Sequence, residues 1–271
     1  ASWHTNVHEY GARRLAGLLG ALPEAFREST LNWAEQTSLS LVMWFYRKAR
    51  VLFAPNQELV DRLAEGTGLP VRLMRRGIDC DLYRPDRRAR QDAAFVVGFV
   101  GRLSPEKNVR ELAAVEQALE AAGAADFRMF IVGDGAERDW LRQNLKHCDA
   151  PGILTGEPLA AAYASMDVFA FPSLTDTYGN VVSEAQASGV PAVVMNGGGP
   201  KFLVRNGVDG FVANSPREFA ARIVELHGSP DLLGRLRLGA REAALGRSWE
   251  AVFEGVYHAY DDALEAVGQR A

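Results

Sequence analysis

The chain has 271 residues, of which 48% are hydrophobic and 24% charged, and its formal net charge is −4. These values are typical of a globular protein with a sizeable core, and they disfavour a broadly basic protein that binds nucleic acid. No run of about 18 apolar residues occurs, so we expect no membrane-spanning segment. The two cysteines exclude a disulfide framework and favour a reducing compartment, which makes the cytoplasm the expected location.

The first third of the chain contains short elements. Residues 30–50 predict a helix that is apolar nearly all round over 39–46 and basic at its end. We interpret it as a core helix. A helix lying on a membrane surface is the alternative, and it leaves peripheral association with the inner face of a membrane open. Asn56 is expected to cap a helix that ends near residue 64.

Residues 84–93 are polar and charged and include Pro85, which predicts a domain boundary. Beyond them, short apolar runs alternate with helical patterns. Continuous apolar strands of this kind form a parallel sheet covered on both faces, so the sequence predicts a doubly wound, Rossmann-like α/β domain. The expected strands are 95–100, 127–132, 153–155, 168–171, 191–194 and 210–213, and the expected helices include 105–122, 136–147, 158–165, 181–188, 216–228, 230–245 and 249–267.

Ligands of such folds bind beyond the carboxyl ends of the strands, so the loops there form the candidate site. After the strand at 95–100, Ser104 is expected to cap the next helix, which places Lys107 in its first turn. A cation opposes the helix dipole there unless an anion binds beside it. Lys107 and Arg102 therefore predict a phosphate clamp. The alternative is a pair of solvated basic side chains near Glu106.

Glycines mark two further loops on this edge. Gly133 and Gly135 flank Asp134 after the second strand, and three glycines occupy 197–199. Both runs permit close approach to a ligand, or simply a tight or flexible turn. No GxGxxG followed by an acid about 20 residues later occurs, which argues against a dinucleotide cofactor. His and Cys residues lack metal-site spacing, so we predict neither a metal nor a cofactor.

The loop after the strand at 168–171 carries two acids eight residues apart, Asp176 and Glu184. Carboxylates accept hydrogen bonds from neighbouring hydroxyls, so the two acids favour a sugar or a ribose as the ligand. The backbone N–H groups of Tyr178, Gly179 and Asn180 begin the following helix, where an anion is also favoured. A helix cap beside a solvated acid is the alternative interpretation.

Together these segments resemble the carboxyl-terminal half of a family 4 (group 1) retaining glycosyltransferase of GT-B fold. The resemblance rests on GRLSPEKN at 101–108, VGDG at 132–135, the segment 162–191 and GGGP at 197–200. MRRGIDCDLYRP at 74–85 is similar to the family's segment entering that half. SWHTNVHEY at 2–10 resembles a strand end and loop of the family's amino-terminal domain.

The resemblance implies a role for each candidate residue. Arg102 and Lys107 would hold the diphosphate of a nucleotide-sugar donor, and Glu184 would bind its ribose. Asp176 would bind hydroxyls of the transferred sugar, although the family usually has the longer Glu there. His4 matches a histidine near that sugar, or is an ordinary surface residue. The remaining donor contacts fall on Gly101, Gly133, Asp134, Gly135, Thr177, Tyr178, Gly179, Asn180 and Val181.

The activity implied is a retaining transfer of a hexosyl unit from a GDP- or UDP-sugar, with GDP-mannose preferred, to a lipid or carbohydrate acceptor. Two cations on the leaving diphosphate would replace a divalent metal. A nucleotide-sugar-binding module without catalysis is the main alternative, and an NAD-dependent oxidoreductase is a weaker one.

The resemblance also implies a division of the chain. Residues 1–83 would be the remnant of an amino-terminal, acceptor-side domain, 84–248 the donor-binding domain, and 249–271 a helix crossing back to the first. The family's early glycine-rich loop has no counterpart, so we expect a truncated chain that binds nucleotide but turns over poorly. We interpret the aromatic stripe on the last helix, Trp249, Phe253, Tyr257 and Tyr260, as core or interdomain packing, with a sugar platform as the alternative.

Overall fold

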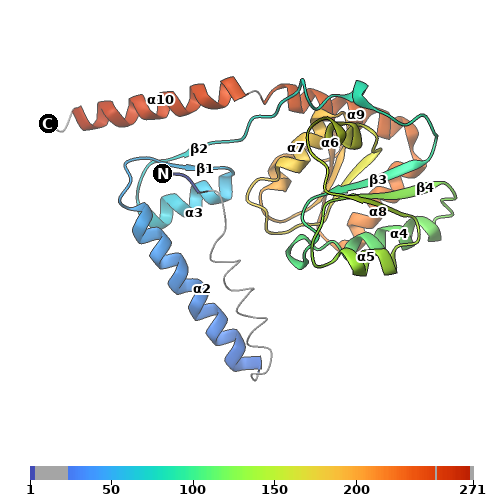
Figure 1. The fold of residues 1–271 in the computed structure, drawn as a ribbon. Helices are drawn as coiled ribbons and strands as arrows, with labels where there is room; N and C mark the ends of the chain where they lie inside the picture. Colours follow the sequence, from blue (N-terminus) through green and yellow to red (C-terminus); the bar gives the residue numbers. More distant parts are fainter. Residues whose placement is uncertain (4–23, 248, 269–271) are drawn as a thin grey trace. The chain divides into compact units, whose positions relative to one another are not determined.

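The computed structural model describes residues 1–3, 24–247 and 249–268 (Figure 1). The chain divides into two compact units. Residues 1–75 and 252–271 make up the small unit, and residues 76–251 make up the large unit. The sequence predicted boundaries after residues 83 and 248. In the structure, the segment 76–83 lies in the large unit.

The small unit is built on two short parallel strands, β1 (Leu52–Ala54) and β2 (Val71–Leu73), joined by α3 (Gln57–Thr67). Asn56 caps α3 as expected, because its side chain accepts a hydrogen bond from the Leu59 backbone N–H at 3.0 Å. The helix α2 (Glu24–Tyr46) packs on this layer through Met43. The core of the small unit includes the fully buried Leu52 of β1 and Leu63 of α3.

The carboxyl-terminal helix α10 (Trp249–Gly268) packs on the small unit through small residues. Ala259 is buried against Phe53, and Tyr260 meets the Phe53 ring edge-on at 5.8 Å. Phe253 and Tyr257 remain 51% and 66% exposed. Most of the aromatic stripe therefore does not pack into the core of the small unit. The side chains of α10 that contact this core closely include alanines.

The large unit contains a six-stranded, fully parallel sheet, which confirms the predicted fold class. Its strand order is β5-β4-β3-β6-β7-β8, the order of a doubly wound Rossmann sheet. The first strand of the unit, β3, therefore lies at the centre, beside β6. The strands are β3 (Phe95–Val100), β4 (Phe127–Val132), β5 (Cys148–Gly152), β6 (Val168–Phe171), β7 (Ala192–Met195) and β8 (Gly210–Ala213).

Helices cover both faces of this sheet, as expected for strands that are apolar throughout (Figure 1). One face carries α4 (Glu111–Ala121), α5 (Arg138–Asn144) and α8 (Pro216–Gly228). The other carries α6 (Gly156–Ala164), α7 (Asn180–Ala187) and α9 (Pro230–Leu245). Three single 3₁₀ turns complete the unit, at Pro85–Arg87, Pro105–Lys107 and Pro200–Phe202.

Two predicted elements were wrong. The helix expected over 105–122 is a 3₁₀ turn at Pro105–Lys107 followed by α4, because Asn108 adopts the left-handed conformation (φ 51°) between them. The Ser104 side chain makes no capping bond. The strand expected at 153–155 lies at Cys148–Gly152 instead. β5 is an edge strand with alternating exposure and contains Pro151, so it lacks the continuous apolar run of the central strands.

Candidate functional site

Four loops at the carboxyl edge of the sheet are joined in two pairs by backbone hydrogen bonds. The loop after β3 bonds to the loop after β4, through Leu103 N–H to the Asp134 carbonyl at 2.9 Å. The loop after β6 bonds to the loop after β7, through Gly199 N–H to the Asp176 carbonyl at 2.6 Å. On each side of this edge, neighbouring loops are thus tied to one another.

Glycines make these loop contacts possible. A Cβ on Gly133 would lie 1.9 Å from the Gly101 carbonyl oxygen, and one on Gly199 would lie 2.0 Å from the Thr177 carbonyl oxygen. Gly135, at φ 154°, would place a Cβ 2.3 Å from the Leu103 carbonyl oxygen. The close approach that these glycines permit is made to the backbone of neighbouring loops, and their contact with a ligand stays a prediction. The Asp134 side chain accepts from the Gly135 N–H at 2.8 Å and stays exposed.

The two central loops are held together by side chains at the β3–β6 junction. Lys107 Nζ lies 2.6 Å from Asp176 Oδ1, and both side chains are largely buried. Asn108 donates to the Pro172 carbonyl at 3.2 Å, and Thr175 donates to the Glu106 carbonyl at 3.3 Å. Two residues that the sequence assigned to different parts of the donor are therefore an ion pair.

Asp176 has one carboxylate oxygen left over. Its Oδ2 is buried and accepts no hydrogen bond from the residues that the structure describes. A buried acceptor without a partner is unfavourable, so a ligand hydroxyl or N–H that reached this oxygen would be stabilised there. The pair with Lys107 therefore engages only one of the two oxygens of this carboxylate.

Arg102 lies on the same edge but is not part of this ion pair. Its side chain is 70% exposed, and its guanidinium lies 4.0 Å from the Glu106 carboxylate. An exposed pair at that distance is weak, so the guanidinium is free to move toward an anion. The phosphate clamp predicted from Arg102 and Lys107 is thus not assembled here, because Lys107 is engaged with Asp176.

Glu184, the second acid of the motif, lies in α7 and is partly buried. Its Oε2 accepts a hydrogen bond from the Tyr163 hydroxyl at 2.7 Å. Burial raises the pKa of Glu184 above its ordinary value, and the Tyr163 hydrogen bond partly opposes that shift. Tyr163 itself was missed in the sequence, where it stood out only as a tyrosine among alanines before the strand β6.

The start of α7 forms the remaining wall of this loop. Gly179 is its N-terminal cap in the left-handed conformation (φ 96°), and the following Asn180 is exposed. The Tyr178 side chain points inward, and its hydroxyl donates to the Arg76 carbonyl at 2.9 Å. The first N–H groups of a helix lack intrahelical partners, so this end of α7 suits an anion or a hydroxyl. Thr177 and Val181 are half-buried beside it.

His4 lies outside the described residues, so the structure does not place it. Within the described residues, His, Cys, Asp and Glu form no group of three or more that could hold a metal ion.

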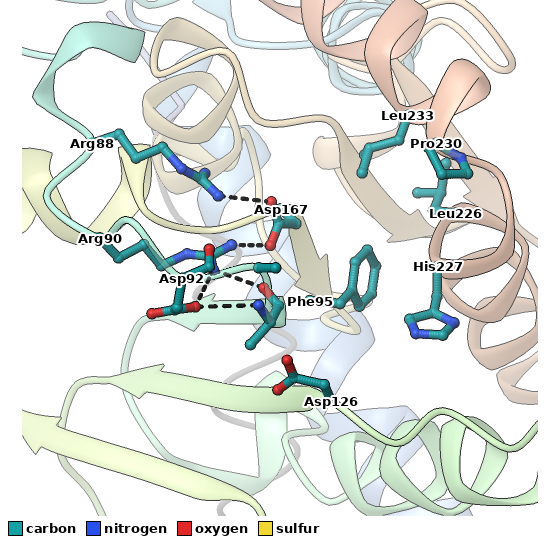
Figure 2. A pocket seen from close by; sticks show the side chains of 12 residues that line it. Arg88, Arg90, Asp92, Phe95, Asp126, Asp167, Leu226, His227, Pro230 and Leu233 are labelled. Atoms are coloured by element: carbon teal, nitrogen blue, oxygen red, sulfur yellow. Dashed lines mark hydrogen bonds and ion pairs between the residues drawn. The ribbon is translucent and has the colours of Figure 1, made fainter.

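A pocket of about 360 Å³ lies at the opposite, amino-terminal edge of the sheet (Figure 2). Its wall contains Phe95, the first residue of β3, and Asp167, which precedes β6. Figure 2 shows Arg88 and Arg90 directed at the Asp167 carboxylate. Because these groups bond to one another, the cluster holds the segment entering β3 against the start of β6, and it is separate from the predicted site.

Residues 94–229 match the family described as "Glycosyl transferases group 1". Two curated relatives are GDP-mannose-dependent alpha-mannosyltransferases. The one from Mycolicibacterium smegmatis is 33% identical and aligns with 97% of this chain and 72% of its own length. The one from Mycobacterium tuberculosis is 35% identical and aligns with 80% of this chain and 59% of its own length.

Solved structures share the fold at low identity. Sucrose-phosphate synthase from Thermosynechococcus elongatus has a TM-score of 0.74 and 21% identity, over 98% of this chain and 67% of that chain. Anabaena HepE in complex with UDP-glucose has a TM-score of 0.72 and 22% identity, over 84% of this chain and 68% of that chain.

Proposed function

We propose a function from one premise: this chain belongs to the group 1 glycosyltransferase family. The family match covers half of the chain, and the Mycolicibacterium relative, at 33% identity, aligns along nearly all of it. The expected family is therefore confirmed. The chain spans between about half and three quarters of the length of its curated relatives, so its activity and substrates are proposals.

The function that we propose is retaining transfer of a hexosyl unit from a nucleotide-diphosphate sugar. The observation that carries it is the ion pair between Lys107 and Asp176, which joins the loops after β3 and β6 at the edge of a doubly wound sheet where such folds bind nucleotides. The relatives named GDP-mannose-dependent alpha-mannosyltransferases favour GDP-mannose as the donor.

In the proposed reaction, the bond between the sugar C1 and the diphosphate oxygen breaks, and a bond from C1 to the acceptor oxygen forms on the same face. Lys107 and Arg102 stabilise the negative charge that develops on the leaving diphosphate. The acceptor proton passes to an oxygen of that diphosphate. When Lys107 turns to the diphosphate, Asp176 is released to accept hydrogen bonds from sugar hydroxyls, while Glu184 binds the ribose.

A titration of the chain with GDP and with UDP tests the donor site. We expect heat of binding with at least one of them, stronger with GDP, and affinity about 10-fold weaker in Arg102→Ala, because an arginine donates charge-assisted bonds to phosphate. Arg222→Ala, which removes a guanidinium paired with Glu225 on α8, is the control and should bind like wild type. No binding of either nucleotide would refute the site.

A second candidate is a nucleotide-sugar-binding module without turnover. The engagement of Lys107 with Asp176 favours it, because the predicted clamp of Arg102 and Lys107 on a leaving diphosphate is not assembled. Release of GDP from GDP-mannose, measured with and without acceptor extracts, separates the two. Sustained release supports transfer, and tight binding without release supports the module.

We also propose that an exposed face of α2 contacts an anionic membrane surface that supplies a lipid acceptor. Described helices are too short or too polar to cross a bilayer. Trp33, Leu41, Trp44 and Phe45 are nevertheless more than half exposed on α2, and Lys48 Nζ lies 5.2 Å from the Trp44 ring centre. The basic residues Arg47, Lys48 and Arg50 follow directly after the end of α2. An exposed aromatic face next to basic residues is typical of helices that lie in a membrane interface.

Co-sedimentation with vesicles tests this face. We expect binding to phosphatidylglycerol vesicles, little to phosphatidylcholine vesicles, and a several-fold loss of bound protein in the double variant Trp44→Ser, Phe45→Ser. Leu238→Ser removes a comparably exposed apolar side chain from α9 and should bind like wild type. Equal sedimentation of all three proteins would contradict the proposal.

A further inference from the structure

Tyr163 is a fully buried tyrosine whose hydroxyl points at the candidate site. It lies in α6 and is 0% exposed. Its ring is fixed on two sides, by Tyr83 edge-on at 5.7 Å and by Phe169 of β6 at 5.7 Å. Packing of this kind leaves the ring a single position, so the hydroxyl is directed at Glu184 on the neighbouring helix.

Within the described residues, a single side-chain hydrogen bond holds the Glu184 carboxylate. Tyr163 is the one side chain in the described part of the chain that bonds to it, at Oε2. The other oxygen, Oε1, accepts no bond from the described residues. A carboxylate on a flexible stem would otherwise sample several rotamers, including ones turned toward solvent. The Tyr163 hydroxyl therefore selects one orientation and leaves one oxygen available.

We propose that Tyr163 is a positioning residue for Glu184: it holds one carboxylate oxygen so that the other accepts hydrogen bonds from the ribose hydroxyls of the donor. This inference rests on the proposed function and deepens it, because it assigns recognition of the vicinal diol to a pair of residues on two helices. A nucleotide without those hydroxyls would gain nothing from the pair.

The protonation states agree with this role. Burial and the adjacent Glu184 carboxylate raise the pKa of Tyr163 well above its ordinary value, so the hydroxyl keeps its proton and donates it. Burial raises the pKa of Glu184, and the bond from Tyr163 lowers it. Removing the hydroxyl should therefore raise the Glu184 pKa further. Ribose binding needs the ionised carboxylate. As the pH is lowered, the affinity for GDP would therefore begin to fall at a higher pH in the variant than in wild type.

The test compares GDP with 2′,3′-dideoxy-GDP by calorimetry on the whole 271-residue chain. Tyr163→Phe should weaken GDP binding about 10-fold and leave dideoxy-GDP unchanged, since one bond to a charged acceptor is lost. The double variant Tyr163→Phe, Glu184→Gln should bind GDP as tightly as Glu184→Gln alone. Tyr83→Phe is the matched control, because it removes a hydroxyl from the same aromatic pair without removing a hydrogen bond to Glu184.

A second readout does not need the nucleotide. The carboxyl carbon resonance of Glu184, assigned through Glu184→Gln, should titrate at a higher pH in Tyr163→Phe than in wild type and Tyr83→Phe. Equal GDP affinity in Tyr163→Phe and wild type, with loss in Glu184→Gln, would overturn the positioning role and leave the donor site intact. Failure of wild type to bind any nucleotide would overturn the donor site, and with it the role at the ribose. Thermal melts establish that each variant is folded.

Discussion

Replacing Asp167 with alanine is expected to lower the free energy of unfolding by about 3–5 kcal/mol, because it leaves the largely buried Arg90 and the partly buried Arg88 and Arg237 without their shared carboxylate. The Asp167 side chain is 9% exposed and receives hydrogen bonds from Arg88 at 3.1 Å, from Arg90 and Arg237, and from the Val96 backbone N–H at 2.8 Å. Without the carboxylate, three guanidinium groups face one another. Urea unfolding followed by far-ultraviolet circular dichroism measures the loss.

Asp92→Ala is the matched control from the same pocket. The Asp92 side chain is 48% exposed and pairs with Arg128 and Arg90, which lower its pKa to about 2 from an ordinary value of 3.8. Its contribution to stability is present above that ordinary pKa and fades as the pH falls toward 2. At pH 7, Asp92→Ala should lower the free energy of unfolding much less than Asp167→Ala does, because exposed ion pairs contribute little to stability. Equal losses in both variants would show that the Asp167 cluster is not a buried charge centre.

Replacing Lys107 with alanine is expected to reduce release of GDP from GDP-mannose about 100- to 1000-fold, the effect of removing one group that stabilises charge in a transition state. Lys107 lies 2.6 Å from Asp176 and is only 15% exposed, so solvent screens its charge less than that of a surface lysine. GDP affinity should fall about 10-fold as well. Steady-state assays and calorimetry on the same preparation measure the two effects.

Asp176→Asn separates the roles of the pair. Removing this negative charge frees Lys107, so GDP should bind as tightly as in wild type or more tightly, whereas turnover of GDP-mannose should fall. Lys146→Ala, an exposed lysine paired with Glu120 before β5, is the charge-matched control and should leave both quantities unchanged. A Lys107→Ala variant with wild-type turnover would remove this residue from the proposed mechanism.

Much of the fold could be predicted from the sequence because the relevant interactions are local. Asn56 bonds to an N–H three residues away, and the buried strands are runs of apolar residues bounded by turns. Predictions were wrong where the pattern was interrupted. Asn108 breaks the expected helix after Pro105–Lys107, and β5 is an edge strand whose residues alternate in exposure.

The sequence by itself also determined which loops carry the candidate residues, since a parallel sheet collects its carboxyl ends on one edge. It could not pair them. Lys107 with Asp176, Tyr163 with Glu184, and Asp167 with Arg88 and Arg90 are separated by 69, 21, and 79 and 77 residues.

Only the tertiary structure decided these partners, and most of the pairs follow from the pairing of two strands. β3 lies beside β6 in the sheet, with Val97 opposite Val168. That pairing brings the loop of Lys107 to Asp176 at one edge and the segment of Arg88 to Asp167 at the other. The physical reason is that an ion pair needs atoms within a few ångströms, and strand order, which no local pattern encodes, sets which distant residues come that close.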